Sequence, residues 1–320
     1  MRTGYTSPTA RERWIDRALA ARPTLTLVPG HCPWGHASTE AEYSRGFDYE
    51  YHSVRDEFRG RVCRDCGTWY LDPRPAEQDF AVIYPDSYSA YAMTGATGTG
   101  DGVAFRAKAW IERRKIRRYA KFVAAIQGEV LDVGCGDGLL LDSFARAGFP
   151  RHDLVGIDFH PLAVELARAR GHRIVEGRFE AADLGAARYR LIVMNQLIEH
   201  LPDPLAALHK LHGLLVPGGH VFLETPNLDS PNARLARHRH WGGYHYPRHL
   251  YLFSPHSIAD ALSHAELQLV EIRYVPCPVQ WVLTINNLLQ EWRRPWASLL
   301  RFTDWRNPIL LGLFTVADLL

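Results

Sequence analysis

The chain has 320 residues, of which 47% are apolar and 11% aromatic, enough to bury one large core and a small second unit. Its 37 basic and 35 acidic residues leave a net charge of +2, which excludes a global field that recruits nucleic acid or an anionic membrane. Five cysteines fit no disulfide framework in a chain of this length, and no signal peptide or transmembrane-length apolar run is present, so we expect a cytoplasmic protein.

The N-terminal third divides into an arm and a small module. Residues 1–30 are polar and basic and lack a hydrophobic period, which predicts a mobile arm. Residues 31–92 combine aromatic residues, Pro and Gly with potential metal ligands, as expected of a module with short strands. Its ligand set would be a tetrahedral, zinc-ribbon-like site made by Cys32, His36, Cys63 and Cys66. An apo remnant and thiol redox chemistry are the alternatives.

A stretch rich in Gly and Thr at residues 93–102 predicts a flexible join to a larger domain. Residues 103–127 then form one amphipathic helix, whose basic face we expect to be solvated rather than anion-binding. Strand-like and helical segments alternate from there to residue 278. This alternation predicts an α/β core, a Rossmann-like, doubly wound and mostly parallel sheet over residues 103–278.

The last segment, residues 279–320, is rich in Trp and Leu and is expected to form a helical cap. A dimer surface and a peripheral membrane contact are the alternatives, and the chain is expected to be a monomer or a homodimer. We find no closing antiparallel strand between Glu271 and Leu320. The chain is therefore expected either to stop short of its natural terminus or to receive that edge from a partner.

A glycine-rich turn, VLDVGCGDG, marks a nucleotide-type site in the core. The strand ends in Asp132 and runs into Gly134, Gly136 and Gly138 before a helix, an arrangement that lets a ligand approach the backbone closely. The turn alone does not identify the ligand.

A second acidic position narrows the ligand class. Asp158 ends the next strand, where a carboxylate can accept both ribose hydroxyls, and Phe159 beside it can lie against an adenine. A dinucleotide fingerprint would need glycine where Leu139 stands. Asp132 and Asp137 would repel a pyrophosphate and favour the cationic methyl donor S-adenosylmethionine.

The core resembles a class I S-adenosylmethionine-dependent methyltransferase, of the group that includes ubiquinone-pathway O-methyltransferases and many natural-product and sugar methyltransferases. The resemblance is carried by VLDVGCGDG, VGIDFHPLAVELARARG, LIVMNQLIEHLPDPLAALHKLHGLLVPGG and HVFLETPN. It implies that the methionine part of the cofactor is lined by Asp132, Gly134, Cys135, Gly136 and Gly138. It implies further that Asp158 holds the ribose, that Phe179 contributes its backbone, with Glu180 and Asp183 as alternatives, and that Asn195 and Gln196 face the reacting end.

Transfer of a methyl group to a hydroxyl needs alignment and a base. His200 follows the fourth strand and is a candidate base, while the alternative is that Glu199 and His200 only orient the loop after them. Residues 231–256 are rich in His, Arg and aromatic residues and are expected to fold over the acceptor. Within them we expect an acceptor pocket of Trp241, Tyr244 and Arg248, the last facing a carboxylate or phosphate, with His249 and His245 as alternative bases.

The resulting expectation is an enzyme that methylates a small-molecule acceptor, at oxygen, in a sugar or a secondary metabolite of natural-product biosynthesis. Methylation at carbon or nitrogen, an RNA methyltransferase, and a non-catalytic partner that binds S-adenosylmethionine are the alternatives. An RNA enzyme would need a basic stripe beside its pocket, and residues 31–90 carry about as many acids as bases.

Overall fold

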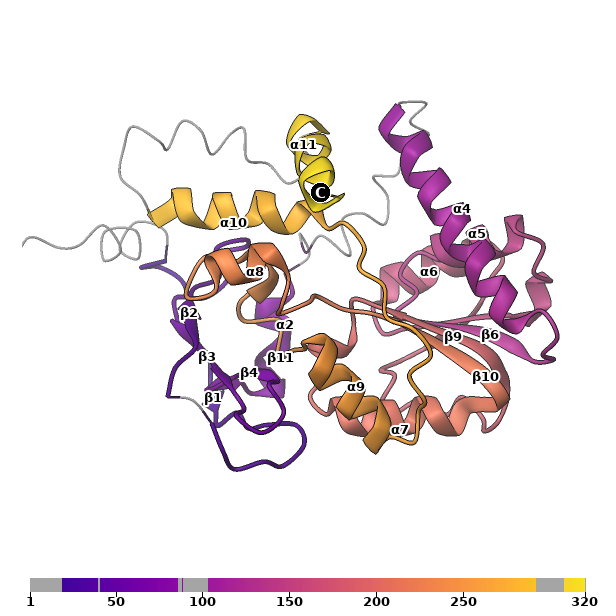
Figure 1. Ribbon diagram of the computed structural model, residues 1–320, viewed down its shortest axis with the longest axis horizontal. Helices are drawn as coiled ribbons and strands as arrows, with labels where there is room; N and C mark the ends of the chain where they lie inside the picture. The colour runs from indigo at the N-terminus through magenta and orange to yellow at the C-terminus, as the bar shows by residue number, and fades with distance from the viewer. Residues whose placement is uncertain (1–18, 40, 86–87, 89–102, 292–307, 320) are drawn as a thin grey trace, which may run out of the picture. The chain divides into compact units, whose positions relative to one another are not determined.

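The computed structural model describes residues 19–39, 41–85, 88, 103–291 and 308–319 (Figure 1). The chain divides into two compact units. The first unit draws on Met1–Pro85, Pro226–Ile258 and Val270–Leu320, and the second on Asp86–Thr225 and Ala259–Leu269. The predicted join at residues 93–102 and residues 1–18 of the predicted arm lie outside the described residues.

A five-stranded parallel sheet forms the centre of the second unit, in the order β10-β9-β6-β7-β8. In chain order the strands are β6 (Glu129–Val133), β7 (Leu154–Asp158), β8 (Arg173–Glu176), β9 (Tyr189–Asn195) and β10 (Leu215–Glu224). The direction of the strand order reverses between β6 and β9, and the carboxyl ends of strands at such a switch point form the usual ligand crevice of this fold class. The expected doubly wound α/β core is confirmed.

Helices cover both faces of this sheet. Figure 1 shows α4 (Val103–Val123), α5 (Leu139–Arg146) and α6 (Pro161–Ala169) on one side of it, and α7 (Pro204–Leu214) on the other. The apolar face of α4 is buried at Ile116, Tyr119 and Val123, and the Tyr119 ring lies 3.9 Å from the Phe222 ring, centroid to centroid. The amphipathic pattern therefore does determine how α4 packs.

Local sequence signals set where the helices start after the strands. Pro161 occupies the first turn of α6, and Pro204 that of α7. The Asp203 carboxylate caps α7 by accepting a hydrogen bond from the Ala206 amide at 2.9 Å. Short 3₁₀ turns, η2 (Arg151–Asp153) and η3 (Ile198–His200), complete the connections.

The first unit contains an antiparallel sheet with the order β11-β4-β3-β2. Its strands are β2 (Ser44–Gly46), β3 (Phe58–Val62), β4 (Trp69–Leu71) and β11 (Tyr251–Leu252). A separate pair joins β1 (Leu27–Val28) to β5 (Arg74–Pro75), followed by η1 (Glu77–Asp79) and α2 (Phe80–Ile83). The end of the predicted arm is thus part of this unit, because β1 pairs within it.

The histidine-rich segment differs from the expected domain division. It contributes α8 (Pro231–Ala236), η4 (Gly242–Tyr244) and β11 to the first unit, whereas the sequence pattern placed it in the methyltransferase-like core. The physical reason is aromatic packing: the Tyr244 ring stacks on Trp69 of β4, with centroids 5.4 Å apart. The β11 strand then extends the antiparallel sheet through its pairing with β4.

The predicted C-terminal segment, residues 279–320, is helical where the structure describes it. After α9 (Pro255–His264) come α10 (Pro278–Glu291) and α11 (Pro308–Leu319), and the Trp281 ring of α10 stacks on Phe314 of α11 with centroids 5.7 Å apart. Within residues 271–291 and 308–319 there is no closing strand. No helix among the described residues has the length and apolar character needed to cross a bilayer.

Candidate functional site

The turn that follows β6 is built for a close ligand. Gly134, Gly136 and Gly138 all have left-handed backbones, with φ of +74°, +53° and +81°. The amides of Gly134 and Cys135 donate to the Ile157 carbonyl of β7 at 2.9 and 3.0 Å, which fixes the turn against the neighbouring strand. A side chain built at Gly136 would meet no atom within 4 Å, so the backbone there borders open space.

Asp158 at the end of β7 holds this turn in place. One carboxylate oxygen accepts the Gly136 amide at 2.9 Å, and the other accepts the His160 amide at 2.9 Å. Each oxygen can accept a further hydrogen bond, so the same carboxylate can receive a pair of ribose hydroxyls. The glycine-rich turn and the acidic strand end predicted from the sequence therefore lie together, and Asp158 orients the turn.

The charges around the turn are less negative than the sequence suggested. Asp137 is 7% exposed and pairs with Arg170 at 3.2 Å, so its charge is compensated within the protein. Asp132, 3% exposed at the end of β6, is the acidic residue placed at the switch point. The negative charge that can favour a cationic ligand therefore comes from Asp132 and Asp158 rather than from Asp137.

Cys135 is a packing residue of the turn. Its thiol is buried, and burial first, then the charges of Asp132 and Asp158, raises the pKa of this thiol well above its usual range. It is therefore protonated at neutral pH and is not a nucleophile. Gly156 accommodates it, because a side chain at Gly156 would lie 2.6 Å from the Cys135 sulfur.

Two residues that the sequence analysis did not single out join Asn195 at the carboxyl ends of β9 and β10. The ammonium of Lys115 on α4 contacts Glu224 at 2.5 Å and the Asn195 side-chain oxygen at 3.5 Å. Burial would lower the pKa of Lys115, but the Glu224 charge raises it above its usual value. Gln196 is exposed, with φ of +49°, and its amide donates to the Glu224 carbonyl.

Phe159 and Phe179, the two aromatic residues predicted to contact the cofactor, have different environments. Phe159 is 52% exposed directly after β7, at the carboxyl edge of the sheet. Phe179 is 4% exposed, and the Lys210 ammonium lies 5.0 Å from its ring centroid and donates to its carbonyl at 2.6 Å. Its side chain therefore belongs to the packed interior, and only its backbone remains a candidate contact.

Glu199 and His200 lie on η3, just beyond β9. Glu199 is fully buried, and burial raises the pKa of its carboxyl to about 8. The Thr225 hydroxyl donates to one of its oxygens at 2.9 Å, and the other oxygen makes no hydrogen bond among the described residues. His200 is partly exposed beside it and is the candidate base that this unit supplies.

A family model described as a methyltransferase domain matches residues 105–272, more than half of the chain. The chain belongs to this methyltransferase family. Its second unit carries the Rossmann-like sheet of a class I, S-adenosylmethionine-dependent methyltransferase.

The curated relatives of this methyltransferase match part of its length. A ubiquinone biosynthesis O-methyltransferase from Alkalilimnicola ehrlichii is 35% identical over 116 residues, which cover 34% of this chain and 46% of that protein. One from Xanthomonas oryzae is 35% identical over 159 residues, 45% of this chain and 64% of that protein. The chain thus spans about half to two thirds of these relatives.

Among solved structures, the [4+2]-cyclase SpnF matches with a TM-score of 0.47 and 16% identity, covering 77% of this chain and 90% of that one. This likeness concerns the fold alone.

The acceptor residues predicted in the methyltransferase's histidine-rich segment lie in the interior of the first unit. Trp241 is 0% exposed, and its indole nitrogen donates to the Asn232 side chain at 3.2 Å. Tyr244 is 1% exposed, and its hydroxyl donates to the Arg237 carbonyl. Both side chains pack as core residues, which differs from the open pocket lining that we expected.

Arg248 also differs from that expectation. It is 0% exposed, and its two terminal nitrogens donate to the two oxygens of Asp48 at 3.0 Å each. The Tyr51 ring covers the guanidinium, 4.2 Å from its centroid. A guanidinium held in this way is committed to an internal partner rather than to a carboxylate or phosphate of an acceptor.

The two alternative bases adjoin each other, with ring centroids 5.0 Å apart. His245 has a left-handed backbone, with φ of +42°, and its Nδ1 lies 2.5 Å from the Glu50 carboxylate. His249 is 7% exposed, and its Nδ1 bonds the Gly243 carbonyl at 2.7 Å. Because a carbonyl only accepts, Nδ1 of His249 carries the proton, and its neutral form keeps the lone pair on Nε2.

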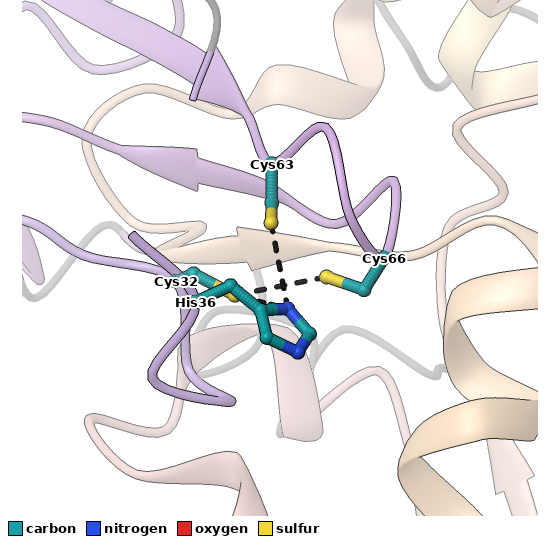
Figure 2. A group of neighbouring side chains, drawn as sticks. All are labelled: Cys32, His36, Cys63 and Cys66. Carbon is teal, nitrogen blue, oxygen red and sulfur yellow. Dashed lines mark hydrogen bonds between the residues drawn. The ribbon is translucent and has the colours of Figure 1, made fainter. Parts of the chain in front are cut away.

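The four predicted metal ligands come together in the first unit. Figure 2 shows the sulfurs of Cys32, Cys63 and Cys66 and the ring of His36 pointing toward a common centre. Their candidate ligand atoms all lie within 4.8 Å of one another. Each pair is held by a tight turn, in which the Gly35 amide donates to the Cys32 carbonyl and the Gly67 amide to the Cys63 carbonyl.

The distances fit a tetrahedral metal centre. Zinc bonds of about 2.3 Å to sulfur and about 2.0 Å to nitrogen imply ligand separations of about 3.5 to 3.8 Å. The Cys32 and Cys66 sulfurs are 3.6 Å apart, and His36 Nδ1 lies 3.6 Å from Cys32 and 3.5 Å from Cys63. The hydrogen bond from Cys32 lowers the pKa of the Cys66 thiol below its usual range, which favours a thiolate there.

Proposed function

We propose that this methyltransferase moves the methyl group of S-adenosylmethionine to an oxygen of a small-molecule acceptor. The observation that carries the proposal is the Asp158 carboxylate, which locks the Gly136 turn at the carboxyl end of the sheet while keeping acceptor capacity for ribose hydroxyls. The open space beside Gly136 supports a ligand at that position.

The chain's own residues have three tasks in this reaction. When bound, S-adenosylmethionine supplies an activated methyl group on a sulfonium, and attack by the acceptor oxygen forms the O–CH₃ bond as the S–CH₃ bond breaks. Asp132 and Asp158 favour the cationic donor over anionic nucleotides, since both carboxylates lie at the turn. Asn195, whose side-chain oxygen accepts from the Lys115 ammonium, shapes the reacting end. A histidine takes the proton that leaves the acceptor hydroxyl.

His200 is the base that we favour. It follows β9 on η3, at the same edge of the sheet as the glycine turn, and it belongs to the same unit as Asp158. His245 and His249 remain the alternatives, His245 because Glu50 orients its ring and His249 because its neutral form keeps a lone pair on Nε2.

Oxygen as the methylated atom is supported by the relatives, whose names specify O-methyltransferases of ubiquinone biosynthesis. A sugar or a secondary metabolite is the acceptor class that we propose, because a ribbon-like module precedes the core.

We also propose that Cys32, His36, Cys63 and Cys66 hold one structural zinc ion. The cluster supplies three sulfurs and one imidazole nitrogen at tetrahedral separations, and zinc would stabilise a small unit whose strands have two to five residues.

The test of the proposed activity is transfer of labelled methyl from S-adenosylmethionine to a panel of hydroxylated sugars and phenols, with mass spectrometry of the product. A methyl ether on a small molecule supports the proposal. Labelled product that disappears after ribonuclease treatment would instead identify an RNA methyltransferase, and no transfer to any acceptor despite tight cofactor binding would identify a non-catalytic binding partner.

A further inference from the structure

An exposed apolar stretch lies between α9 and α10, where Figure 1 shows a coil. Residues 269–275 read LVEIRYV, and five of these seven side chains are apolar. All five are exposed, from 38% at Ile272 to 72% at Tyr274. Contiguous exposed apolar side chains usually mark a surface that binds another molecule.

This stretch has the composition of a strand but belongs to none of the sheets that the structure describes. Residues 267–277 form no helix, strand or turn. The β-branched and aromatic residues at positions 270, 272, 274 and 275 are of the types that favour strands. The Leu267 amide donates to the Leu262 carbonyl at 2.9 Å at the end of α9, and Pro276, which has no amide hydrogen, ends the stretch. The backbone between them can therefore pair with a strand of another chain.

The charges of this stretch are complementary to those of a second copy. Glu271 and Arg273 contact each other at 2.5 Å and are 37% and 64% exposed, so both can also meet charges on another chain. In an antiparallel pair of two copies centred on Ile272, each Glu271 stands opposite Arg273 of the second copy. Sliding one copy by two residues along the other places Glu opposite Glu or Arg opposite Arg, which is unfavourable. The charges therefore favour a second copy as the partner and select one register.

The apolar residues match in the same register. Val270, Ile272 and Tyr274 lie on one face of an extended strand, because side chains alternate along it. Val270 stands opposite Tyr274 of the second copy, and Ile272 stands opposite Ile272. On the other face, Leu269 stands opposite Val275. Each of the five exposed apolar side chains thus faces an apolar side chain of the second copy.

We propose that residues 269–275 pair with the same residues of a second copy, as antiparallel strands related by a two-fold axis at Ile272. Such an interface uses the same surface on both chains and closes after two of them. All contacts of this pairing come from one continuous stretch of each chain. Because this makes a small interface, the dimer should be reversible.

Sedimentation velocity of the full chain, at concentrations of about 5 to 500 µM, tests the proposal. We expect the mass to rise from one chain to two chains with concentration. Glu271→Arg and Arg273→Glu should each weaken the dimer by roughly tenfold, because like charges then stand opposite each other at two symmetric positions. The double variant Glu271→Arg/Arg273→Glu should restore it, since each Arg again faces a Glu. Arg234→Glu is the matched control, because its side chain is 70% exposed on α8, similar to that of Arg273.

A mixture of the two single variants tests the partner and the register together. Neither Glu271→Arg nor Arg273→Glu should associate well alone, whereas the mixture should form mixed dimers as tightly as the wild type does. As a second measurement, Ile272→Cys in a Cys277→Ser background should form a disulfide between two chains on mild oxidation. Opposite residues of antiparallel strands have Cα atoms about 4.5 to 5.5 Å apart, within the reach of a disulfide. Ile309→Cys, at another exposed apolar position, should not form one.

Four outcomes would overturn the proposal: a one-chain mass over the whole concentration range, growth beyond two chains, equal loss of association in Arg234→Glu and Arg273→Glu, or a mixture that associates no better than its two components. Circular dichroism melting of each variant separates lost association from lost folding. If a charge variant unfolds, the Ile272→Cys cross-link decides, and its failure to form would contradict the two-fold pairing.

Discussion

Arg248 and Asp48 form a two-pronged ion pair with both hydrogen bonds 3.0 Å long and neither side chain exposed. The Ser53 amide and hydroxyl complete the shell around the Asp48 carboxylate at 2.8 and 2.6 Å. Burial would raise the pKa of Asp48, but the Arg248 charge and these hydrogen bonds lower it to about 2. The pair joins two segments of the first unit that lie 200 residues apart in the chain.

Breaking this pair is expected to destabilise the first unit. Arg248→Met leaves the Asp48 charge buried without its partner and should cost about 3 to 5 kcal/mol of unfolding free energy, whereas the double variant Asp48→Leu/Arg248→Met should recover most of that loss. Because the folded-state pKa of Asp48 is depressed from 3.8 to about 2, its stabilisation is present above pH 3.8 and is lost as the pH falls through about 2. Urea unfolding measures both effects. If Arg248→Met unfolds at the same urea concentration as the wild type but has a raised KM for the acceptor, Arg248 binds the acceptor instead.

Glu199 should make the free energy of unfolding fall as the pH rises, whereas the Asp48 contribution is lost as the pH falls. Burial raises the pKa of its carboxyl from 4.5 to about 8, so the folded state holds a proton that the unfolded state has released between these values. Its stabilisation is therefore present in full below pH 4.5 and is lost as the pH rises from there to about 8. Glu199→Gln should flatten urea-unfolding stability across this range. A variant with the same pH dependence as the wild type would show that Glu199 is ionised in the folded protein.

One zinc ion per chain is expected in purified protein by elemental analysis. Cys63→Ser should abolish this metal and lower the melting temperature, because the first unit loses a tetrahedral ligand. Cys277→Ser is the control, since Cys277 lies outside the cluster and is half-buried. Metal retained in Cys63→Ser, or lost equally in Cys277→Ser, contradicts the assigned ligand set.

Three histidine variants distinguish the candidate bases. If His200 removes the acceptor proton, His200→Asn should lower kcat by about 10² to 10⁴ with an unchanged Kd for S-adenosylmethionine. His245→Asn and His249→Asn should then change kcat much less. A large kcat loss confined to His249→Asn or His245→Asn would transfer the role to that residue, and Glu50→Gln would be expected to reproduce the His245 effect because Glu50 orients that ring.

The features that could be predicted from the sequence are those set by local pattern. The period of α4, the glycine turn and the acidic strand ends predicted the core and the place of Asp132 and Asp158 at one edge of the sheet, because parallel strands bring their carboxyl ends to that edge. The grouping of the four cluster residues could also be predicted from the sequence, since their spacing creates two tight turns. These residues are Cys32, His36, Cys63 and Cys66.

Ion pairs between residues that are far apart in the sequence could not be predicted from local pattern. Nothing in the sequence around Asp48 indicates that it pairs with Arg248. Nothing around Arg170 indicates that it pairs with Asp137. Glu224 could have been found, because it ends a strand at the same edge as Asp158, but Lys115 looked like part of a solvated basic face. The aromatic character of Trp241 and Tyr244 suggested a pocket, although the same character serves a core equally well.

Calorimetry with S-adenosylmethionine, on the wild type and on Asp158→Ala, tests whether the Gly136 turn and Asp158 bind the methyl donor. We expect one cofactor to bind per chain of the wild type and at least a tenfold weaker affinity in Asp158→Ala, since the variant loses both the ribose acceptor and the hydrogen bond that holds the Gly136 amide. Asp229→Ala, at an exposed position of the first unit, should bind as the wild type does. Absence of binding to the wild type, or an Asp158→Ala affinity equal to it, would contradict the claim.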